Sequence, residues 1–183
     1  MFQRLFGRAR GVNRDVTEAL YGAIVAAARQ PPLYSRWDVP DTPLGRFEML
    51  SLHMFLFQHR LRDETGAARA LAQDLIDAFF ADVDHSLREL GIGDMGIPKR
   101  MKKLARMFYG RTAAYADAIE RRDGDALAAA LRRNVRPGDE AAWAEAGALA
   151  AYVLAAHDLL TGQQVDAIIG GKVVFPDAAA FPI

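Results

Sequence analysis

The stretch LIDAFFADVDHSLREL, residues 75–90, has the spacing of a helix that buries one face. Its large apolar residues recur three and four positions apart, at Ile76, Phe79, Phe80, Val83, Leu87 and Leu90. That period matches a helical turn, and it differs from the continuous Val/Ile run of a buried parallel strand. The segment therefore predicts an amphipathic helix. The glycine-rich residues that follow it must then be judged as residues that come after a helix.

The next six residues, GIGDMG at 91–96, fit the dinucleotide-binding pattern G-x-G-x-x-G letter for letter. Asp117 even lies about twenty residues further on, where an acid that binds ribose would stand. In nucleotide-binding proteins, however, these glycines connect a strand to a helix. Here a helix precedes them and no strand–helix alternation is seen elsewhere, so we interpret 91–96 as a turn whose glycines permit positive φ.

Helical patterns extend over most of the chain, because Ala and Leu dominate and the breakers fall between periodic segments. Thr42 before Pro43, Asp125 and Asp139 are the expected N-caps, and Gly91 is the expected C′ residue. We expect a loop in PPLYSRWDVPD, residues 31–41, and a strand only in KVVF, residues 172–175. The predicted helices cover residues 14–29, 43–62, 67–90, 98–122, 125–134 and 139–160, with a short helical turn at 163–169.

These segments predict an all-α protein, with a single compact multi-helix bundle domain and a short extended C-terminal tail. Residues 1–13 are expected to be a basic amphipathic N-terminal segment, residues 14–171 the helical domain, and residues 172–183 the extended tail. A chain of 183 residues is long enough for one well-buried core. No internal repeat or low-complexity linker suggests a second domain.

The composition narrows the function classes. The 51% of hydrophobic residues excludes a disordered chain, and no apolar run reaches the roughly 18 to 20 residues that span a bilayer. Cysteine is absent, so disulfides, thiolate zinc sites and cysteine nucleophiles are excluded. The N-terminus lacks the apolar core of a secretory signal. We therefore expect a cytoplasmic protein, with peripheral contact at the inner face of the cytoplasmic membrane as a further prospect.

The net charge of zero conceals an uneven distribution. Residues 1–14 and 95–111 hold ten of the 23 basic residues and no acidic residue. The rest of the chain carries 13 basic residues against 23 acidic ones. Two basic patches on an acidic body point to charged partners, and they say little about the fold.

The second basic patch faces an acidic one across the 91–96 turn. On the preceding helix, Asp74, Asp77 and Asp84 project opposite to the apolar stripe. On the following helix the cations fan across the exposed face, with Arg100 near its edge: Lys99, Arg100, Lys102, Lys103 and Arg106. Because no acid is interleaved with these cations, we favour a binding surface over the alternative of an ordinary solvated face.

The first basic patch suggests a membrane contact. In MFQRLFGRARGV, residues 1–12, the apolar Phe2, Leu5, Phe6 and Ala9 share one helical face, and arginines occupy another. Segments of this kind lie in the interface of anionic bilayers. The alternative is a frayed terminus that touches nothing.

No motif for catalysis or metal binding stands out. His53 and His59 are six residues apart on one predicted helix, whereas metal-binding pairs on a helix are usually three or four apart. Asp77 and Asp84 are separated by about 10 Å of helical rise, but an exposed helix face offers no pocket to shift their pKa. We expect no enzyme activity, cofactor or metal. Tyr34 and Trp37 are expected to fill gaps over the bundle, with partner contact as the alternative.

Several stretches together resemble a known family. The elements LRELGIGD (87–94), K-x-x-KK (99–103) and FYGR-x-x-x-Y (108–115) follow one another closely behind Asp77 and Asp84. Further matches lie at 20–34 and 39–61, and a fainter one lies in the closing GGKVVFPD. This combination resembles the ubiquinol–cytochrome c chaperone family, which are assembly factors of the cytochrome bc1 complex. The likeness covers residues 14–135 well and the remainder loosely.

The resemblance implies a non-enzymatic factor that binds newly made cytochrome b. Mitochondrial members also act at the ribosome exit region within a heterodimer. This chain has no long presequence before the domain, which suits a bacterial member. An alternative function is a peripheral membrane- or RNA-binding helical module unrelated to respiration. By residue matching and by charge, the expected partner-binding residues are Asp77, Asp84, Arg88, Asp94, Lys99, Arg100, Lys102, Lys103, Arg106, Tyr109 and Arg111.

Overall fold

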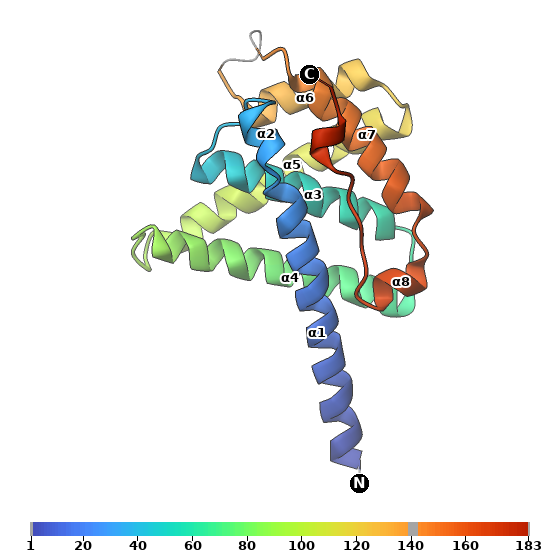
Figure 1. Cartoon of the computed structure of the whole chain (residues 1–183). Helices are drawn as coiled ribbons and strands as arrows, with labels where there is room; N and C mark the ends of the chain where they lie inside the picture. Colours follow the sequence, from blue (N-terminus) through green and yellow to red (C-terminus); the bar gives the residue numbers. More distant parts are fainter. Residues whose placement is uncertain (1, 139–142, 183) are drawn as a thin grey trace.

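The computed structural model describes residues 2–138 and 143–182, with side chains from Arg14 onward, and it confirms the all-α bundle (Figure 1). Within these residues no strand is formed. The helices are α1 (Phe2–Ala28), α2 (Pro31–Ser35), α3 (Pro43–Leu61), α4 (Gly66–Glu89), α5 (Ile97–Glu120), α6 (Gly124–Val135), α7 (Ala146–Gly162) and α8 (Val165–Ile169), followed by the 3₁₀ turn η1 (Ala178–Ala180).

The helix α3 forms the centre of the bundle and contacts α1, α4, α5, α6 and α7. Its buried residues lie on all sides of the helix, as expected of a helix with neighbours all round. From Met49 to Phe57, every residue except Leu50 is buried. Fully buried side chains from the surrounding helices complete the core, among them Ile24, Leu75, Phe79, Leu131 and Tyr152.

Local signals in the sequence set most helix ends. The Thr42 side chain accepts a hydrogen bond of 3.1 Å from the Gly45 amide, which confirms the predicted N-cap of α3. Gly45 lies so close to the Pro40 carbonyl oxygen that a Cβ there would come within 1.9 Å of it. Gly91 has φ +77° and ends α4 as predicted, because a left-handed residue there is easiest for glycine.

Two caps were predicted at the wrong residue or cannot be located. The N-cap of α6 is Asp123, not Asp125, since the Asp123 carboxylate accepts a hydrogen bond of 2.8 Å from the Ala126 amide. The helix expected from Asp139 begins at Ala146, after Glu145. Asp139 itself lies outside the described residues.

The predicted loop at 31–41 contains the short helix α2 and is held inward by its aromatic residues. Trp37 is fully buried, and its carbonyl accepts a hydrogen bond of 2.8 Å from the Trp143 indole nitrogen. The Tyr34 hydroxyl donates to the Ala28 carbonyl at 2.8 Å. The expectation that these rings fill gaps over the bundle is confirmed, and the buried Trp37 offers no surface to a partner.

The strand predicted at residues 172–175 is wrong. This segment is irregular, and glutamine side chains bind the backbone of this segment and of the residues that follow it. Gln163 contacts both backbone groups of Val174, at 2.8 and 2.9 Å. Gln30 donates to the Pro176 carbonyl and accepts from the Ala178 amide, at 3.0 and 2.7 Å. The tail is extended up to η1 and is bound along the bundle.

Within residues 2–138 and 143–182, no helix combines the length and the hydropathy that a membrane crossing requires. The helix α1 begins at Phe2, well before the predicted start at residue 14. The side chains of the predicted basic amphipathic segment, residues 1–13, lie outside the described residues.

Candidate functional site

The helices α4 and α5 form a long antiparallel hairpin whose end projects from the bundle (Figure 1). Aromatic side chains hold the two helices together. The Phe79 and Phe108 rings are 5.3 Å apart, and the Phe80 and Phe108 rings are 6.0 Å apart in an edge-to-face arrangement. Such pairs add to the hydrophobic gain from burial, so the hairpin is a rigid support for the charges that it carries.

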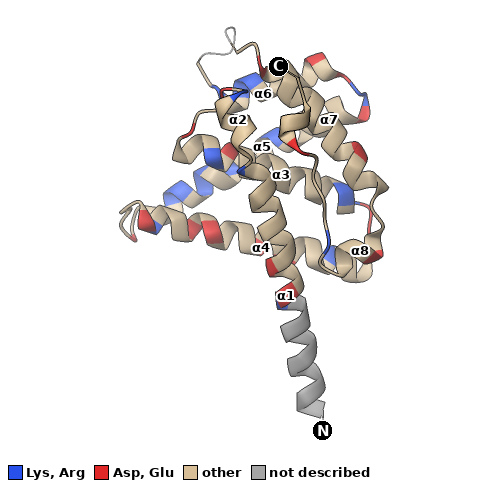
Figure 2. Ribbon diagram, viewed as in Figure 1, with Lys and Arg blue, Asp and Glu red and all other residues tan. Residues whose placement is uncertain are grey.

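The cations of α5 form one continuous exposed surface, which we call the basic stripe and define as Lys99, Arg100, Lys102, Lys103 and Arg106. They begin directly after Pro98 in the first turn of the helix and lie opposite the buried Phe108. In the described part of the chain, none of the five forms an ion pair. All five residues are exposed, so the positive charge of the stripe is available to a partner. Figure 2 shows Lys and Arg residues following one another along α5.

The acidic residues on the neighbouring α4 are engaged within the hairpin. Arg88 Nε lies 2.7 Å from an Asp84 carboxylate oxygen, and Arg88 also pairs with Asp94 in the turn. The Gln73 amide donates to Asp77 at 2.9 Å. These contacts fix the turn against the end of α4 and partly neutralise its acids. The structure thus places Asp77, Asp84 and Arg88 on α4 and Asp94 in the turn that leads to the basic stripe. We call Asp77, Asp84 and Asp94 the acidic edge.

Arg111 departs from the predicted surface. Only 7% of its side chain is exposed, and it forms an ion pair with Glu48 of α3, whose side chain is 1% exposed. Burial lowers the pKa of the Arg111 guanidinium from its usual value. The spacing of Leu104, Phe108, Arg111 and Tyr115, at intervals of four, three and four, follows the buried stripe of α5 and indicates an inward position.

Tyr109 is 57% exposed and marks the edge of a groove that the sequence did not predict. The groove has a volume of about 470 Å³ and lies between α3, α4 and α5. Its apolar walls include Phe55, Ile76, Phe108 and Ala116. Polar side chains accompany them, namely Gln58, His59, Arg62, Gln73 and Thr112. A site of this composition suits an apolar segment with a few polar groups.

His59 and Arg62 give the far end of the groove its electrostatic character. Burial lowers the pKa of His59, and the neighbouring charges of Arg62 and His157 lower it further. The rings of His59 and His157 are 5.3 Å apart. Arg62 forms ion pairs with Glu120 of α5 and with Asp63. His59, whose pKa is lowered, and Arg62, which is ion-paired, therefore make this end of the groove polar and add no unpaired charge to it.

The histidines that were considered as a metal pair lie in different surroundings. His53 is fully buried and contacts the Tyr152 hydroxyl at 2.8 Å, whereas His59 borders the groove. Among the described residues, no group of three or more His, Asp or Glu side chains is arranged to hold a metal ion.

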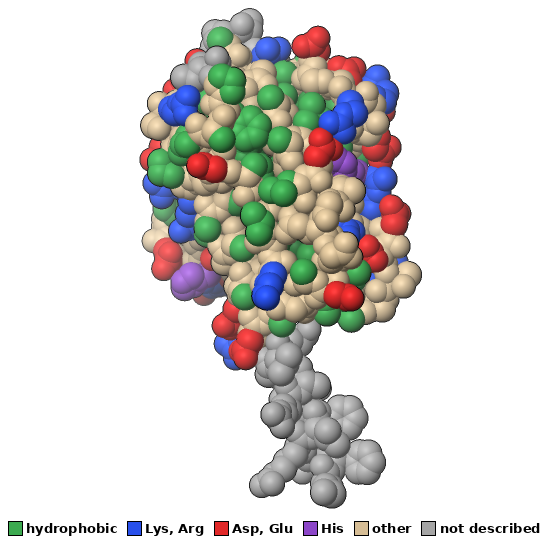
Figure 3. Space-filling view, turned by 45° about the vertical axis from the view of Figure 1, so that its right-hand side comes forward, with side chains coloured by type: hydrophobic (Ala, Val, Ile, Leu, Met, Phe, Trp, Pro, Cys, Tyr) green, Lys and Arg blue, Asp and Glu red, His purple; other side chains and the backbone are tan. Residues whose placement is uncertain are grey.

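The face formed by α7 and the C-terminal tail differs from the hairpin. Hydrophobic side chains run down its middle, and single charges of both signs lie mainly around its edge (Figure 3). This face therefore lacks the separation of cations onto one helix and acids onto its neighbour that the α4–α5 hairpin shows. The groove opens along the same hairpin, so the two features belong to one surface.

The sequence profile of the ubiquinol–cytochrome C chaperone family matches residues 35–175. The chain belongs to this family. The match includes α4, α5, the basic stripe and every residue of the groove.

Known members agree with this assignment. The crystal structure of the Cbp3 homolog from Brucella abortus is 53% identical, covers 100% of both chains and superimposes with a TM-score of 0.91. The ubiquinol-cytochrome-c reductase complex assembly factor 1 of Xenopus laevis is 24% identical over 116 residues. That match covers 63% of this chain and 58% of the relative, so the chain spans little more than half of that protein's length.

Proposed function

We propose that this chain is an assembly chaperone of the ubiquinol–cytochrome c reductase (bc1) complex that acts by binding and not by catalysis. Membership of the chaperone family supports the assembly role. The observation that carries a binding role is the continuity of an apolar groove with the basic stripe along one face of the hairpin. Tyr109 belongs to the groove and lies one turn beyond Arg106 of the stripe.

We further propose newly made cytochrome b as the client. A membrane subunit that is not yet assembled exposes apolar segments next to polar loops, and it needs both to be covered. The apolar walls of the groove, Phe55, Ile76 and Phe108, can cover the apolar segments of the client. The basic stripe and the acidic edge can attract and orient the polar loops of the client. Complementary charge mainly sets the association rate and the register of a complex.

A second function rests on the basic stripe alone. Exposed lysines and arginines without neighbouring acids attract phosphate groups of RNA or of lipid headgroups, in a manner that weakens as salt rises. A peripheral membrane- or RNA-binding module would use that attraction without any bc1 subunit. Contact with the ribosome exit region would draw on the same charges, and it is compatible with the chaperone role.

An affinity capture from mildly solubilised membranes of the native cell tests the proposal. The bait is either the wild type or the variant Lys99→Glu/Lys102→Glu/Lys103→Glu. We expect cytochrome b to be recovered with the wild type and lost with the variant. The matched control is Arg69→Glu/Arg133→Glu/Lys172→Glu, which makes the same change of charge at exposed positions elsewhere and should retain the client.

Two results would count against the proposal. Recovery of ribosomal RNA or lipid without any bc1 subunit would favour the second function. Equal loss with the stripe variant and with the control variant would show that net charge matters and the stripe does not. In either case the client-binding role of the hairpin would be abandoned.

A further inference from the structure

The turn that joins α4 to α5, residues 90–96, exposes apolar side chains at the end of the hairpin, and we call it the tip. Met95 is 100% exposed and Leu90 is 59% exposed. Single apolar residues on a surface are common, but a fully exposed methionine at the end of a projecting hairpin is not. Apolar side chains that remain in water at such a place are available to enter another apolar phase.

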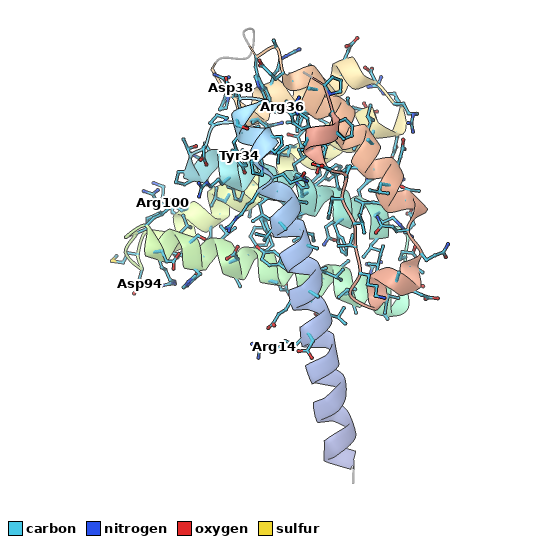
Figure 4. The ribbon with its side chains drawn as sticks, viewed as in Figure 1. Arg14, Tyr34, Arg36, Asp38, Asp94 and Arg100 are labelled. Atoms are coloured by element: carbon cyan, nitrogen blue, oxygen red, sulfur yellow. The ribbon has the colours of Figure 1, made fainter. Side chains whose placement is uncertain are left out.

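Cations lie directly behind the tip. Lys99 is four residues after Met95, and the exposed cations continue to Lys103. From Lys99 to Lys103 the helix rises by about 6 Å, close to the thickness of one headgroup layer of a bilayer. Figure 4 shows Asp94 at the end of the hairpin and Arg100 on the helix behind it. Apolar residues at the end and cations one layer behind them match the profile of an anionic bilayer surface.

The acids near the tip do not cancel this pattern. Asp94 is paired with Arg88, which also holds Asp84 at 2.7 Å. Arg88 offsets one of these two carboxylates, and Glu89 adds a third acid beside the tip. The five cations of the basic stripe outnumber the acids that remain, so the charge behind the tip is positive on balance.

The same residues favour lipid over nucleic acid as the partner of the tip. Proteins that bind single-stranded RNA stack its bases on aromatic rings. Residues 90–96 contain no aromatic residue, and their large exposed apolar side chains are Leu90 and Met95. Aliphatic side chains gain little from base stacking, whereas they gain free energy on entering acyl chains.

We infer that the α4–α5 tip docks on an anionic bilayer surface, with Leu90 and Met95 entering the interface and Lys99, Arg100, Lys102 and Lys103 contacting the lipid phosphates. The hairpin would then stand on the membrane, and the groove near Tyr109 would stay clear of it. This inference does not rest on the bc1 role. It assigns the attraction for lipid named above to one end of the hairpin and adds an apolar contact there.

The test places a tryptophan at the tip of the full-length protein. Met95→Trp is mixed with vesicles of phosphatidylcholine and about one third phosphatidylglycerol. We expect its fluorescence to shift to the blue and to be quenched by brominated acyl chains. The native Trp37 and Trp143 are 0% and 1% exposed and give a constant background. Val174→Trp is the matched control, because Val174 is 59% exposed on the tail, and it should not respond.

Affinity measurements complete the test. Met95→Ser should weaken binding to these vesicles roughly tenfold, by the loss of one buried apolar side chain. Lys102→Glu/Lys103→Glu should weaken it at least about fivefold for each charge changed, and pure phosphatidylcholine vesicles should bind weakly. The Met95 variants leave the groove and Arg106 untouched, so a failure in this assay is distinct from a failure to capture cytochrome b.

Three results would overturn the inference. Met95→Trp could respond no more than Val174→Trp. Vesicle binding could be unchanged by Met95→Ser and lost with Arg8→Glu/Arg10→Glu, which would assign the membrane contact to the N-terminal segment. Salt-sensitive RNA binding without any vesicle binding would assign the cations to nucleic acid.

Discussion

Arg111 of α5 and Glu48 of α3 form an ion pair inside the bundle, where 7% and 1% of their side chains are exposed. The pair links the helix that carries the basic stripe to the central helix of the core. Removing two charges from water is costly, and their mutual attraction offsets that cost only while both are present. The pair therefore contributes to the placement of the hairpin more than to its surface charge.

Replacing one partner should be far more damaging than replacing both. Arg111→Met leaves the Glu48 carboxylate buried without a counter-charge, so we expect a loss of about 3 to 5 kcal/mol in the free energy of unfolding. Glu48→Leu/Arg111→Met should recover most of that loss, because an apolar pair needs no compensation. Urea unfolding followed by circular dichroism measures both variants.

The stabilities of Arg111→Met and of the double variant together separate the effect of the unpaired charge from that of packing. If Arg111→Met unfolds like the wild type, the ion pair makes no net contribution to the stability of the fold. If the double variant is as unstable as the single one, the loss comes from packing around Arg111 and not from the unpaired charge.

His53 should make the stability of the protein fall in mild acid. Burial lowers its pKa to about 4, below the usual value near 6.5. Between these values the unfolded chain takes up a proton that the folded protein does not, so acid favours unfolding. From about pH 7.5 to about pH 5 we expect this residue to reduce the free energy of unfolding by about 2 kcal/mol.

Urea titrations at the two pH values check this effect. His53→Gln should show a smaller drop in stability than the wild type, because glutamine does not titrate. His85→Gln is the control, because it makes the same replacement at a side chain that is 69% exposed. An unaltered pH dependence in His53→Gln would mean that other groups cause the acid sensitivity.

Much of the fold could be predicted from local signals. The periodicity of residues 75–90 and the turn at Gly91 were sufficient to reject a nucleotide-binding fold, and the α4–α5 hairpin confirms that interpretation. The error at residues 172–175 has a physical cause. The backbone N–H and C=O groups of a Val-rich segment can form hydrogen bonds either with a neighbouring strand or with side chains. Here the Gln163 side chain forms them.

The candidate site was only partly predictable. The basic stripe repeats along a single helix, so its spacing identifies it. Arg111 was placed on the surface by its match to the family pattern, although the spacing from Phe108 and to Tyr115 indicated burial. The groove combines Phe55, Ile76 and Thr112 from three helices. No local pattern encodes a hollow between helices, because it depends on how they pack.

The cap of α3 offers a direct test of local stabilisation. Thr42→Ala removes the hydrogen bond of 3.1 Å to the Gly45 amide, and we expect a cost of about 1 kcal/mol in the free energy of unfolding. Thr65→Ala is the matched control. Thr65 occupies the N-cap position of α4, but its side chain makes no capping bond. Equal losses in the two variants, measured by urea unfolding, would contradict the role assigned to the Thr42 hydroxyl.

Filling the groove should separate client binding from stability. Ala113 borders the groove on α5, whereas the next residue, Ala114, is exposed and outside it. Ala113→Trp would place an indole in the space next to Tyr109, and we expect the recovery of cytochrome b to fall about tenfold. Ala114→Trp adds the same side chain to the same helix and should leave recovery unchanged.

Both variants should unfold within about 0.5 kcal/mol of the wild type, because each substitution is on an exposed part of α5. The measurement is affinity capture from solubilised membranes, with quantification of the cytochrome b polypeptide. Unchanged capture by Ala113→Trp would exclude the groove as the client site and leave the basic stripe as the contact. Loss of capture by both variants would show that the whole outer face of α5 binds the client, and that the groove has no separate role.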